Sequence, residues 1–324
     1  MRKLLIILVA FITLPQAALA QPAIAEPIDV ATFAVDLRPR DPDQTNVGRL
    51  QYLGGIVLRA DDRRFGGISG LRFVDDDTRL LAVSDRGNWI TFRPTIEHTR
   101  LVGASEVLLW PILSASGNPV EAPHYDAESL TFIGDTAYIG FERVHRIDAF
   151  STPLSGANPH PDSFRDAAAF GTRENNGGLE GLTTLSGGRL LGIVEAASED
   201  STFDGWIMDD EGHTEGLALF AQDPFSLTDI ATLPNGDVIT LERRFSALSG
   251  VGARLRLIPA SRISPGALLD GEVLAELGAG YTVDNMEGLA VRETGGRTEI
   301  FIISDDNQNP LQRTILMAFE LLPE

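Results

Sequence analysis

Hydrophobic residues along most of the chain come in short runs that alternate with clusters of Gly, Asp and Asn. No helical stripe lasts longer than two turns, so the pattern predicts strands and turns from about residue 47 onwards. One unit recurs five times: an apolar strand that opens with a small or acidic residue, a turn, and a second strand that ends in an acid. The copies are Gly66–Gly87, Asp126–Val144, Gly177–Ala196, Phe225–Arg244 and Asp284–Asn307.

The spacing of the copies leaves room for two more strands after a pair. In the first copy these strands are predicted at Trp89–Arg93 and Glu106–Leu113. In the fourth copy they are predicted at Arg254–Pro259 and Glu272–Leu277. Four antiparallel strands per repeat are typical of a β-propeller, so we expect an all-β, five-bladed propeller.

The last copy has only one further strand, Thr314–Leu322, before the chain ends. A lone strand, Gly48–Leu58, precedes the first copy, and we expect it to supply the missing outer strand and close the ring. Two alternatives stay open. A sixth, degenerate blade would fit the long gap between the first two copies, and two stacked β-sandwich domains would also use strands of this length.

Repetition of the unit gathers equivalent side chains around one axis, because the first strand of each propeller blade lines the central channel. The opening position of the first strand holds Ser69, Glu128, Glu180, Thr228 and Glu287. The end of the second strand holds Asp85, Glu142, Glu195, Glu242 and Asp305. In three copies the next residue is an arginine, namely Arg86, Arg143 and Arg243.

This ring of acids has two interpretations. In the first, each acid caps backbone amides of a neighbouring blade or pairs with a nearby arginine, and so joins the blades. In the second, the converging acids form a site, where they either hold raised pKa values or bind a cation. Oxygen ligands without His or Cys favour Ca²⁺ or Mg²⁺, and we expect no organic cofactor.

The second interpretation gives each group a role. Glu128, Glu180 and Glu287 are candidate catalytic residues, as cation ligands or as a general base. The five acids at the strand ends are candidate metal ligands. The three arginines are candidate substrate-binding residues, since a guanidinium holds a carboxylate or phosphate in a bidentate manner.

The N-terminus has the pattern of a secretory signal peptide: Arg2 and Lys3, an apolar run from Leu4 to Leu14, and the small residues before position 21. We expect cleavage after Ala20 and a periplasmic or secreted protein. The predicted organisation is a signal peptide at 1–20, a flexible leader at 21–46 and a propeller domain at 47–324.

Composition narrows the possible partners. The formal net charge of −20 disfavours nucleic acid and anionic lipid as partners. No segment beyond the signal peptide is apolar over the length of a membrane span. Because the chain has no cysteine, disulfides, thiolate metal sites and cysteine nucleophiles are excluded. The oligomeric state stays open.

Two further motifs suggest chemistry less strongly. The run Gly67–Gly70 is one residue short of the Gly-x-Ser-x-Gly pattern of serine esterases and begins a strand, so Ser69 is interpreted as the blade-one counterpart of the glutamates. The run Ser304–Pro310 is dense in oxygen ligands but lacks the EF-hand spacing. A turn ended by Asn-Pro is expected there, with a calcium loop as the alternative.

Four runs of the sequence together have a familiar pattern: GGISGLRF…LLAVSDRG, GGLEGL, the ERRF at Glu242–Phe245, and DNMEGLAV…ISDDNQNPLQRTILMAFEL. They resemble the bacterial family called esterase-like activity of phytase, or phytase-like. The resemblance spans about residues 48 to 322 and implies an exported propeller that hydrolyses phosphate or carboxylate esters, so a small ester or phosphoester is the expected partner. The alternatives are a non-catalytic propeller that binds a ligand or protein, and a metal-dependent lactonase.

Overall fold

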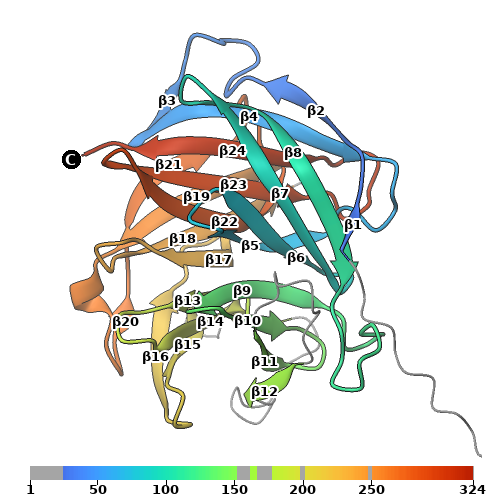
Figure 1. Ribbon diagram of the computed structural model, residues 1–324. Helices are drawn as coiled ribbons and strands as arrows, with labels where there is room; N and C mark the ends of the chain where they lie inside the picture. Colours follow the sequence, from blue (N-terminus) through green and yellow to red (C-terminus); the bar gives the residue numbers. More distant parts are fainter. Residues whose placement is uncertain (1–24, 152–160, 166–176, 198–200, 247–249, 324) are drawn as a thin grey trace, which may run out of the picture.

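The computed structural model describes residues 25–151, 161–165, 177–197, 201–246 and 250–323. Its strands form five sheets arranged in a ring, the blades of a five-bladed β-propeller (Figure 1). The predicted fold and blade number are thus confirmed, and the alternatives of six blades or two sandwiches are excluded. Among the described residues the only helix is a short 3-10 turn, η2 (Ala260–Arg262).

Each blade runs from an inner strand to an outer one in the order of the chain. Blade 1 consists of β5 (Ile68–Val74), β6 (Arg79–Ser84), β7 (Asn88–Glu97) and β8 (Arg100–Pro111). Blade 2 consists of β9 (Ala127–Ile133), β10 (Thr136–Phe141), β11 (Arg146–Ser151) and β12 (Asp162–Arg165). Blade 3 consists of β13 (Gly181–Thr184), β14 (Leu190–Ala197), β15 (Thr202–Met208) and β16 (Thr214–Phe220).

The last two blades follow the same order. Blade 4 consists of β17 (Ser226–Thr232), β18 (Val238–Ser246), β19 (Gly250–Ile258) and β21 (Glu272–Leu277). Blade 5 begins with β22 (Asn285–Thr294), β23 (Arg297–Asp305) and β24 (Thr314–Leu321), and its next strand comes from the start of the domain.

The ring is closed by strand β4 (Leu50–Ala60). This strand pairs antiparallel with β24, from Leu50 opposite Leu321 to Leu58 opposite Thr314. Figure 1 shows blue β4 beside red β24, so the two ends of the propeller share one sheet. The prediction that an N-terminal strand supplies the missing outer strand is therefore confirmed. Unfolding of either end exposes the backbone of the other, which couples the termini in one cooperative unit.

Part of the predicted flexible leader also forms strands. β2 (Val30–Val35) pairs with β4, while β1 (Glu26–Pro27) pairs with β8 and β3 (Asn46–Val47) pairs with β4. These pairings cover the outer edges of blades 1 and 5, where unpaired N–H and C=O groups would otherwise be open to another strand. On blade 3 the parallel strand β20 (Leu268–Leu269) has the same effect.

The long gap between the first two copies contains no additional blade. Strands β7 and β8 are long, at 10 and 12 residues, and the chain after β8 forms turns that pack beside β9. A single bridge joins Leu113 and Pro119 in this connection. The length of the gap therefore comes from an extended outer hairpin.

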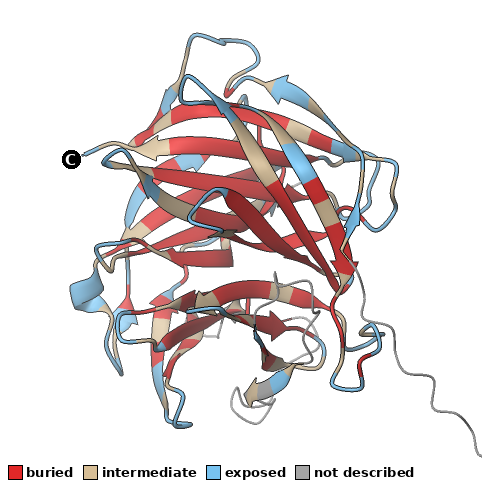
Figure 2. Cartoon of the chain, in the orientation of Figure 1, coloured by how far each residue is buried: buried red, intermediate tan, exposed pale blue. Residues whose placement is uncertain are grey.

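Five hydrophobic clusters hold the ring together, each between two neighbouring blades. Alternation along β23 shows how one strand serves two of them: Ile300 and Ile302 pack toward blade 4, whereas Phe301 and Ile303 pack toward blade 1. Figure 2 shows the result, with buried residues along the strands and exposed residues mainly at the loops and edges.

The described residues contain no helix long and apolar enough to cross a membrane. The predicted signal peptide, residues 1–20, lies outside the part of the chain that the structure describes. The cleavage site and the cellular location thus stay predictions.

Candidate active site at the channel mouth

In two blades the glutamate that opens the inner strand lies at a β-bulge. In blade 2, Ser129 pairs with Gly140 and Ala127 pairs with Phe141, so that Glu128 is an extra residue without a partner. The same irregularity occurs at Glu287 in blade 5. A bulge bends the strand and redirects the side chain of the extra residue, and here it directs the glutamates to the channel mouth.

The strand-end acids are held by a backbone bond that repeats from blade to blade. The N–H of Asp85 donates to the carbonyl of Gly67, and the N–H of Glu142 donates to that of Asp126. In each case the acceptor is the residue two positions before the opening residue of the inner strand. This shared geometry identifies the equivalent position in every blade: Asp85, Glu142, Glu195, Arg243 and Asp305.

Blade 4 thus differs from the sequence alignment by one residue. Ser226 lies opposite Arg243, and Glu242 lies opposite Leu227, so Arg243 occupies the position that holds an acid elsewhere. Successive side chains of a strand point to opposite faces, and a shift of one residue moves a side chain to the other face. The arginine that was expected beside the ring is therefore a member of it.

Glu242, predicted as a metal ligand, does not line the channel mouth. Its carboxylate is fully buried between strands and accepts hydrogen bonds from Arg254 and Arg256, each with an N–O distance of 2.5 Å. Thr240 donates to it as well, at 3.0 Å. Glu242 thus pairs with nearby arginines, as the first interpretation expected, but all these partners belong to blade 4, so the pairs stabilise one blade rather than join two.

The remaining acids surround one cavity of about 270 Å³ on the axis, which we call the axial cavity. Its lining contains eight carboxylates and two arginines. The lining residues are Ser69, Asp85, Asp126, Glu128, Glu142, Arg143, Glu180, Glu195, Arg243, Asn285, Glu287, Asp305 and Asn307. The structure thus brings together all the candidate residues except Glu242 and Arg86. Arg86 lies outside the cavity, with its guanidinium 3.8 Å from the carboxylate of Asp85.

Three lining residues were missed in the sequence: Asp126, Asn285 and Asn307. Asp126 and Asn285 come two positions before Glu128 and Glu287 in the sequence. The repeated Asp-x-Glu and Asn-x-Glu spacing is a signal that could have revealed them. Asn307 belongs to the loop after β23, and no repeat of the pattern reaches it.

Burial and mutual repulsion shift the acids toward their protonated forms. Burial, reinforced by neighbouring carboxylates, raises the pKa of Glu128 and Glu180 well above the usual range. Burial also raises the pKa of Glu287 to about 8, although Arg243 opposes the shift. The pKa of Asp85 rises to about 7 for the same reason, burial first and Asp305 next. Since mutual repulsion contributes to these shifts, a bound cation would stabilise the ionised forms of the acids.

Arg243 neutralises only one side of the axial cavity. Its guanidinium donates to Asn285 at 2.9 Å and to Glu195 at 3.1 Å, and its Nε lies 3.3 Å from Glu287. The other lining arginine, Arg143, pairs with Asp126 and has a side chain that is 51% exposed at the rim. The carboxylates between these two arginines, in blades 2 and 3, are left without a matching positive charge.

Glu142 is oriented by the backbone of the next blade. Its Oε1 accepts the N–H groups of Gly177 at 2.7 Å and Gly178 at 3.0 Å. A Cβ on residue 178 would lie only 2.7 Å from the Cγ of Glu142, so glycine is needed for this approach. Two amide donors fix the carboxylate in place, which is a common feature of ligand and catalytic groups.

Two groups of acids in the axial cavity have ligand atoms close enough to share a metal ion. One group consists of Asp126, Glu128 and Glu142, and the other of Glu142, Glu180 and Glu195. Within each group the ligand atoms lie within 4.8 Å of one another. These clusters could therefore hold a metal ion, with oxygen ligands only.

The floor of the channel is closed by an ion pair, which we call the axial plug. Arg72 donates to both carboxylate oxygens of Asp229 at 2.9 and 3.0 Å. The same guanidinium also donates to backbone carbonyls of four inner strands, at Leu71, Leu182, Ile230 and Leu289. Because it reaches four blades, the guanidinium lies on the axis.

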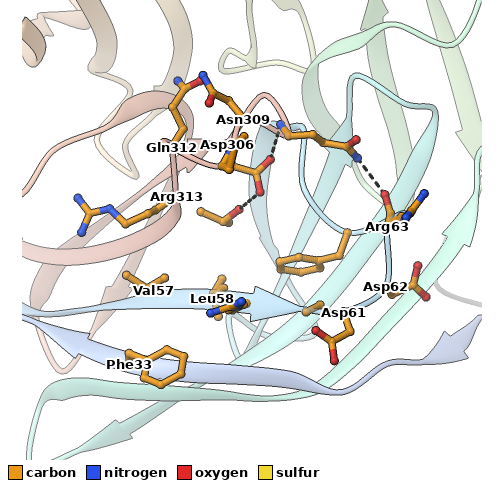
Figure 3. Close-up of a pocket in the computed structure, with 16 residues that line it drawn as sticks. Phe33, Val57, Leu58, Asp61, Asp62, Arg63, Asp306, Asn309, Gln312 and Arg313 are labelled. Atoms are coloured by element: carbon orange, nitrogen blue, oxygen red, sulfur yellow. Dashed lines mark hydrogen bonds between the residues drawn. The ribbon is translucent and has the colours of Figure 1, made fainter.

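A second hollow, of about 860 Å³, lies between β4 and the loop after β23 (Figure 3). Phe33, Val57 and Leu58 line one side, and Asp306, Asn309 and Arg313 line the other. No candidate site residue lines this hollow. The loop is held by its own side chains: Asp305 and Asp306 accept the N–H groups of residues 307 and 308. These bonds agree with the turn expected at 304–310.

The sequence matches one known protein family over most of its length. Residues 63–308 match the model of the phytase-like family, described as esterase-like activity of phytase. The chain belongs to this family. The resemblance found in the sequence runs is thus confirmed for most of this phytase-like propeller. No curated protein matches the sequence.

Solved structures share the fold of this phytase-like chain at low identity. An α-L-arabinofuranosidase from Podospora anserina, in complex with cellotriose, has a TM-score of 0.51 and 9% identity, covering 84% of this chain and 97% of its own. An exo-1,5-α-L-arabinanase from a bovine ruminal metagenomic library has a TM-score of 0.48 and 10% identity, covering 81% and 96%. The glutaminyl cyclase of Myxococcus xanthus has a TM-score of 0.43 and 12% identity, covering 93% and 98%. At such identities the likeness concerns the fold alone.

Proposed function

We propose that the protein is an exported hydrolase of phosphate or carboxylate esters that acts in the axial cavity with the help of a divalent cation. The observation that carries this proposal is the surplus of carboxylates there, eight against two arginines. Membership of the phytase-like family supports the reaction class. Export rests on the signal-peptide pattern of residues 1–20.

The residues present fit a hard divalent cation. Among the described residues no hydrogen bond reaches Glu180, although it is only 7% exposed, and the buried Oδ1 of Asp85 has no hydrogen-bond partner either. A buried carboxylate without a donor is expensive unless a cation occupies its lone pairs. All nearby donors are oxygens, which suits Ca²⁺ or Mg²⁺.

The two overlapping groups described above would hold the cation, through Glu142 and its neighbours. A cation bound there would polarise the ester oxygen and lower the pKa of a water molecule. Glu287 lies outside both groups, and its pKa of about 8 suits a general base near neutral pH. Arg243 holds Glu287 in position, and the exposed Arg143 is placed to bind the anionic part of a substrate at the rim.

Hydrolysis adds one water across the ester bond. The water oxygen bonds to the phosphorus or acyl carbon as one of its protons passes to Glu287. The bond from that atom to the alcohol oxygen breaks, and the alcohol leaves with a proton returned by the acid. A cavity of about 270 Å³ is smaller than most ligand pockets. Only the reacting group enters it, so the rest of the substrate lies over the mouth.

The test uses the purified mature protein with p-nitrophenyl phosphate, p-nitrophenyl acetate and phytate, each with and without a chelator. We expect turnover that the chelator removes and Ca²⁺ or Mg²⁺ restores. Replacing Glu180→Gln and Glu287→Gln together should lower kcat/KM by at least ~100-fold, the usual contribution of acid–base catalysis.

The control for this test is Glu211→Gln, in an exposed acidic turn with Asp209 and His213, away from the axis. Its turnover should equal that of the wild type. If no substrate is turned over and no metal is bound, the protein is a non-catalytic binding propeller. Turnover that survives the double substitution places the chemistry outside the axial cavity, and turnover of lactones alone identifies a lactonase.

A further inference from the structure

The two acidic groups of the axial cavity share one member. Glu142 belongs both to the group with Asp126 and Glu128 and to the group with Glu180 and Glu195. The first group comes from blade 2, and the second adds residues of blade 3. Glu142 therefore lies at the junction of two possible cation positions, and because one carboxylate oxygen has two lone pairs, it can bind a cation on each side.

The orientation of Glu142 suits a shared ligand. Its Oε1 is fixed by the N–H groups of Gly177 and Gly178, and no hydrogen bond from the described residues reaches Oε2. The backbone bonds thus hold one end of the carboxylate against blade 3 and leave the other end free. If this carboxylate served only to join two blades, hydrogen-bond donors would be expected at both of its oxygens.

Glu180 supplies an independent observation. It is 7% exposed, it lines the axial cavity, and none of the described residues donates a hydrogen bond to it. A cation in the first group alone would leave Glu180 without a partner. A cation in the second group alone would leave Glu128 without one, since no described residue donates a hydrogen bond to Glu128 either. Cations in both groups give each glutamate a partner.

We propose that the axial cavity holds two divalent cations that share Glu142, and this inference rests on the proposed function. One cation binds Asp126, Glu128 and Glu142, and the other binds Glu142, Glu180 and Glu195. The axial cavity has eight carboxylates and two arginines, with Arg143 beside Asp126 and Arg243 beside Glu195. With every acid ionised, this surplus of six negative charges falls to four with one dication and to two with two. Two cations therefore compensate the cavity more fully than one.

Two cations narrow the substrate class to phosphate esters. Paired cations stabilise the attacking and the leaving oxygen of an in-line displacement at phosphorus. In that displacement the water oxygen bonds to phosphorus while the bond to the alcohol oxygen breaks. One proton of the water passes to Glu287 and then to the alcohol, so the products are an alcohol and inorganic phosphate for a monoester. We expect kcat/KM for p-nitrophenyl phosphate to exceed that for p-nitrophenyl acetate by at least ~100-fold, about 2.7 kcal/mol of transition-state stabilisation.

The experiment loads the metal-free mature protein with Mn²⁺, which accepts the same oxygen ligands. Equilibrium dialysis with elemental analysis counts the ions, and electron paramagnetic resonance reports whether they are close enough to couple. We expect two coupled Mn²⁺ per wild-type chain. Glu180→Gln should retain one uncoupled ion and Glu142→Gln should retain at most one. The control Glu293→Gln, at an exposed position near the end of β22 and outside every acidic group, should retain the coupled pair.

The outcomes separate this inference from the proposed function. One Mn²⁺ per chain together with chelator-sensitive hydrolysis overturns the pair and leaves the proposed function standing. Two ions without coupling overturn the sharing of Glu142. No bound ion, with hydrolysis unaffected by the chelator, overturns both the pair and the metal-assisted reaction. The wild-type spectrum requires no variant, so the test holds even if a substituted chain fails to fold.

Discussion

The propeller has buried acids at two places on its axis, and the surroundings of these acids differ. In the axial plug, Asp229 receives two bonds from Arg72 and the N–H groups of Ile230 and Leu289. In the axial cavity, Glu180 receives none from the described residues, and Glu287 shares Arg243 with Glu195. The same chemical group is thus fully compensated at the floor and left uncompensated at the mouth.

The electrostatic consequence follows this difference. Burial raises the pKa of Asp229 only to about 6, because Arg72 and backbone donors oppose the effect. Burial raises the pKa of Glu287 to about 8, with only partial opposition from Arg243. A propeller can therefore satisfy acids on its axis where structure alone is at stake. The unsatisfied acids at the mouth indicate a place kept for a ligand.

The largest effect should come from breaking the axial plug. Replacing Arg72→Met leaves Asp229 without its counter-ion and four carbonyls without a donor, so we expect a loss of about 3–5 kcal/mol of unfolding free energy. Chemical denaturation measures it. Arg93→Met is the matched control, because this arginine pairs with Glu106 near solvent and should contribute at most ~1 kcal/mol. Equal losses in the two variants would show that the plug is no more than a surface pair.

The second effect is a fall in stability with rising pH in metal-free protein. An unfolded carboxyl loses its proton near pH 4 to 5, whereas folded Glu287 keeps one up to its pKa of about 8. Between these values the folded state binds more protons, so its stability decreases as pH rises and levels off above pH 8. From pH 6 to pH 8 we expect a loss of about 2 kcal/mol for one retained proton.

The range from pH 6 to pH 8 distinguishes the axial cavity from the axial plug. The pKa of Asp229 is about 6, so the carboxyl group of the plug is mostly ionised above pH 6. Thermal or chemical unfolding at pH 6, 7 and 8 measures the loss. Glu287→Gln should weaken the dependence, and saturating Ca²⁺ should reverse its sign, since the cation binds the ionised form. Stability that stays level from pH 6 to pH 8 without metal would argue that the cavity acids are compensated after all.

The fold was predictable because it depends on patterns that repeat. Strand alternation, hairpin turns and the unit of acid-to-acid pairs recur with each blade, and the unpaired strand before the first copy had one place to go, beside Thr314–Leu321. The axial convergence of Glu128, Glu180 and Glu287 followed from the same repetition. Because each copy of the unit forms one blade, equivalent residues of the copies take equivalent positions around the ring.

The remaining features depend on register and on distant partners. Glu242 and Arg243 are neighbours in the chain, and only the pairing of Arg243 with Ser226 decides which one faces the axis. The axial plug joins residues 157 positions apart, and no sequence pattern near Arg72 predicts Asp229 as its partner. The pattern of one sequence therefore does not specify single-residue shifts in strand pairing or ion pairs between distant residues.

The smallest effect, and the one that tests the comparison most directly, is a pair of isosteric substitutions. At pH 8 without metal, Glu180→Gln removes a charge that its neighbours disfavour, so we expect a gain of about 1 kcal/mol in unfolding free energy. Asp229→Asn should act in the opposite direction, because it removes the partner of Arg72. Denaturation curves of both variants, measured side by side, give the two signs. A loss of stability in Glu180→Gln would mean that Glu180 joins the blades. The acids at the mouth would then have a structural role, like Asp229 in the axial plug.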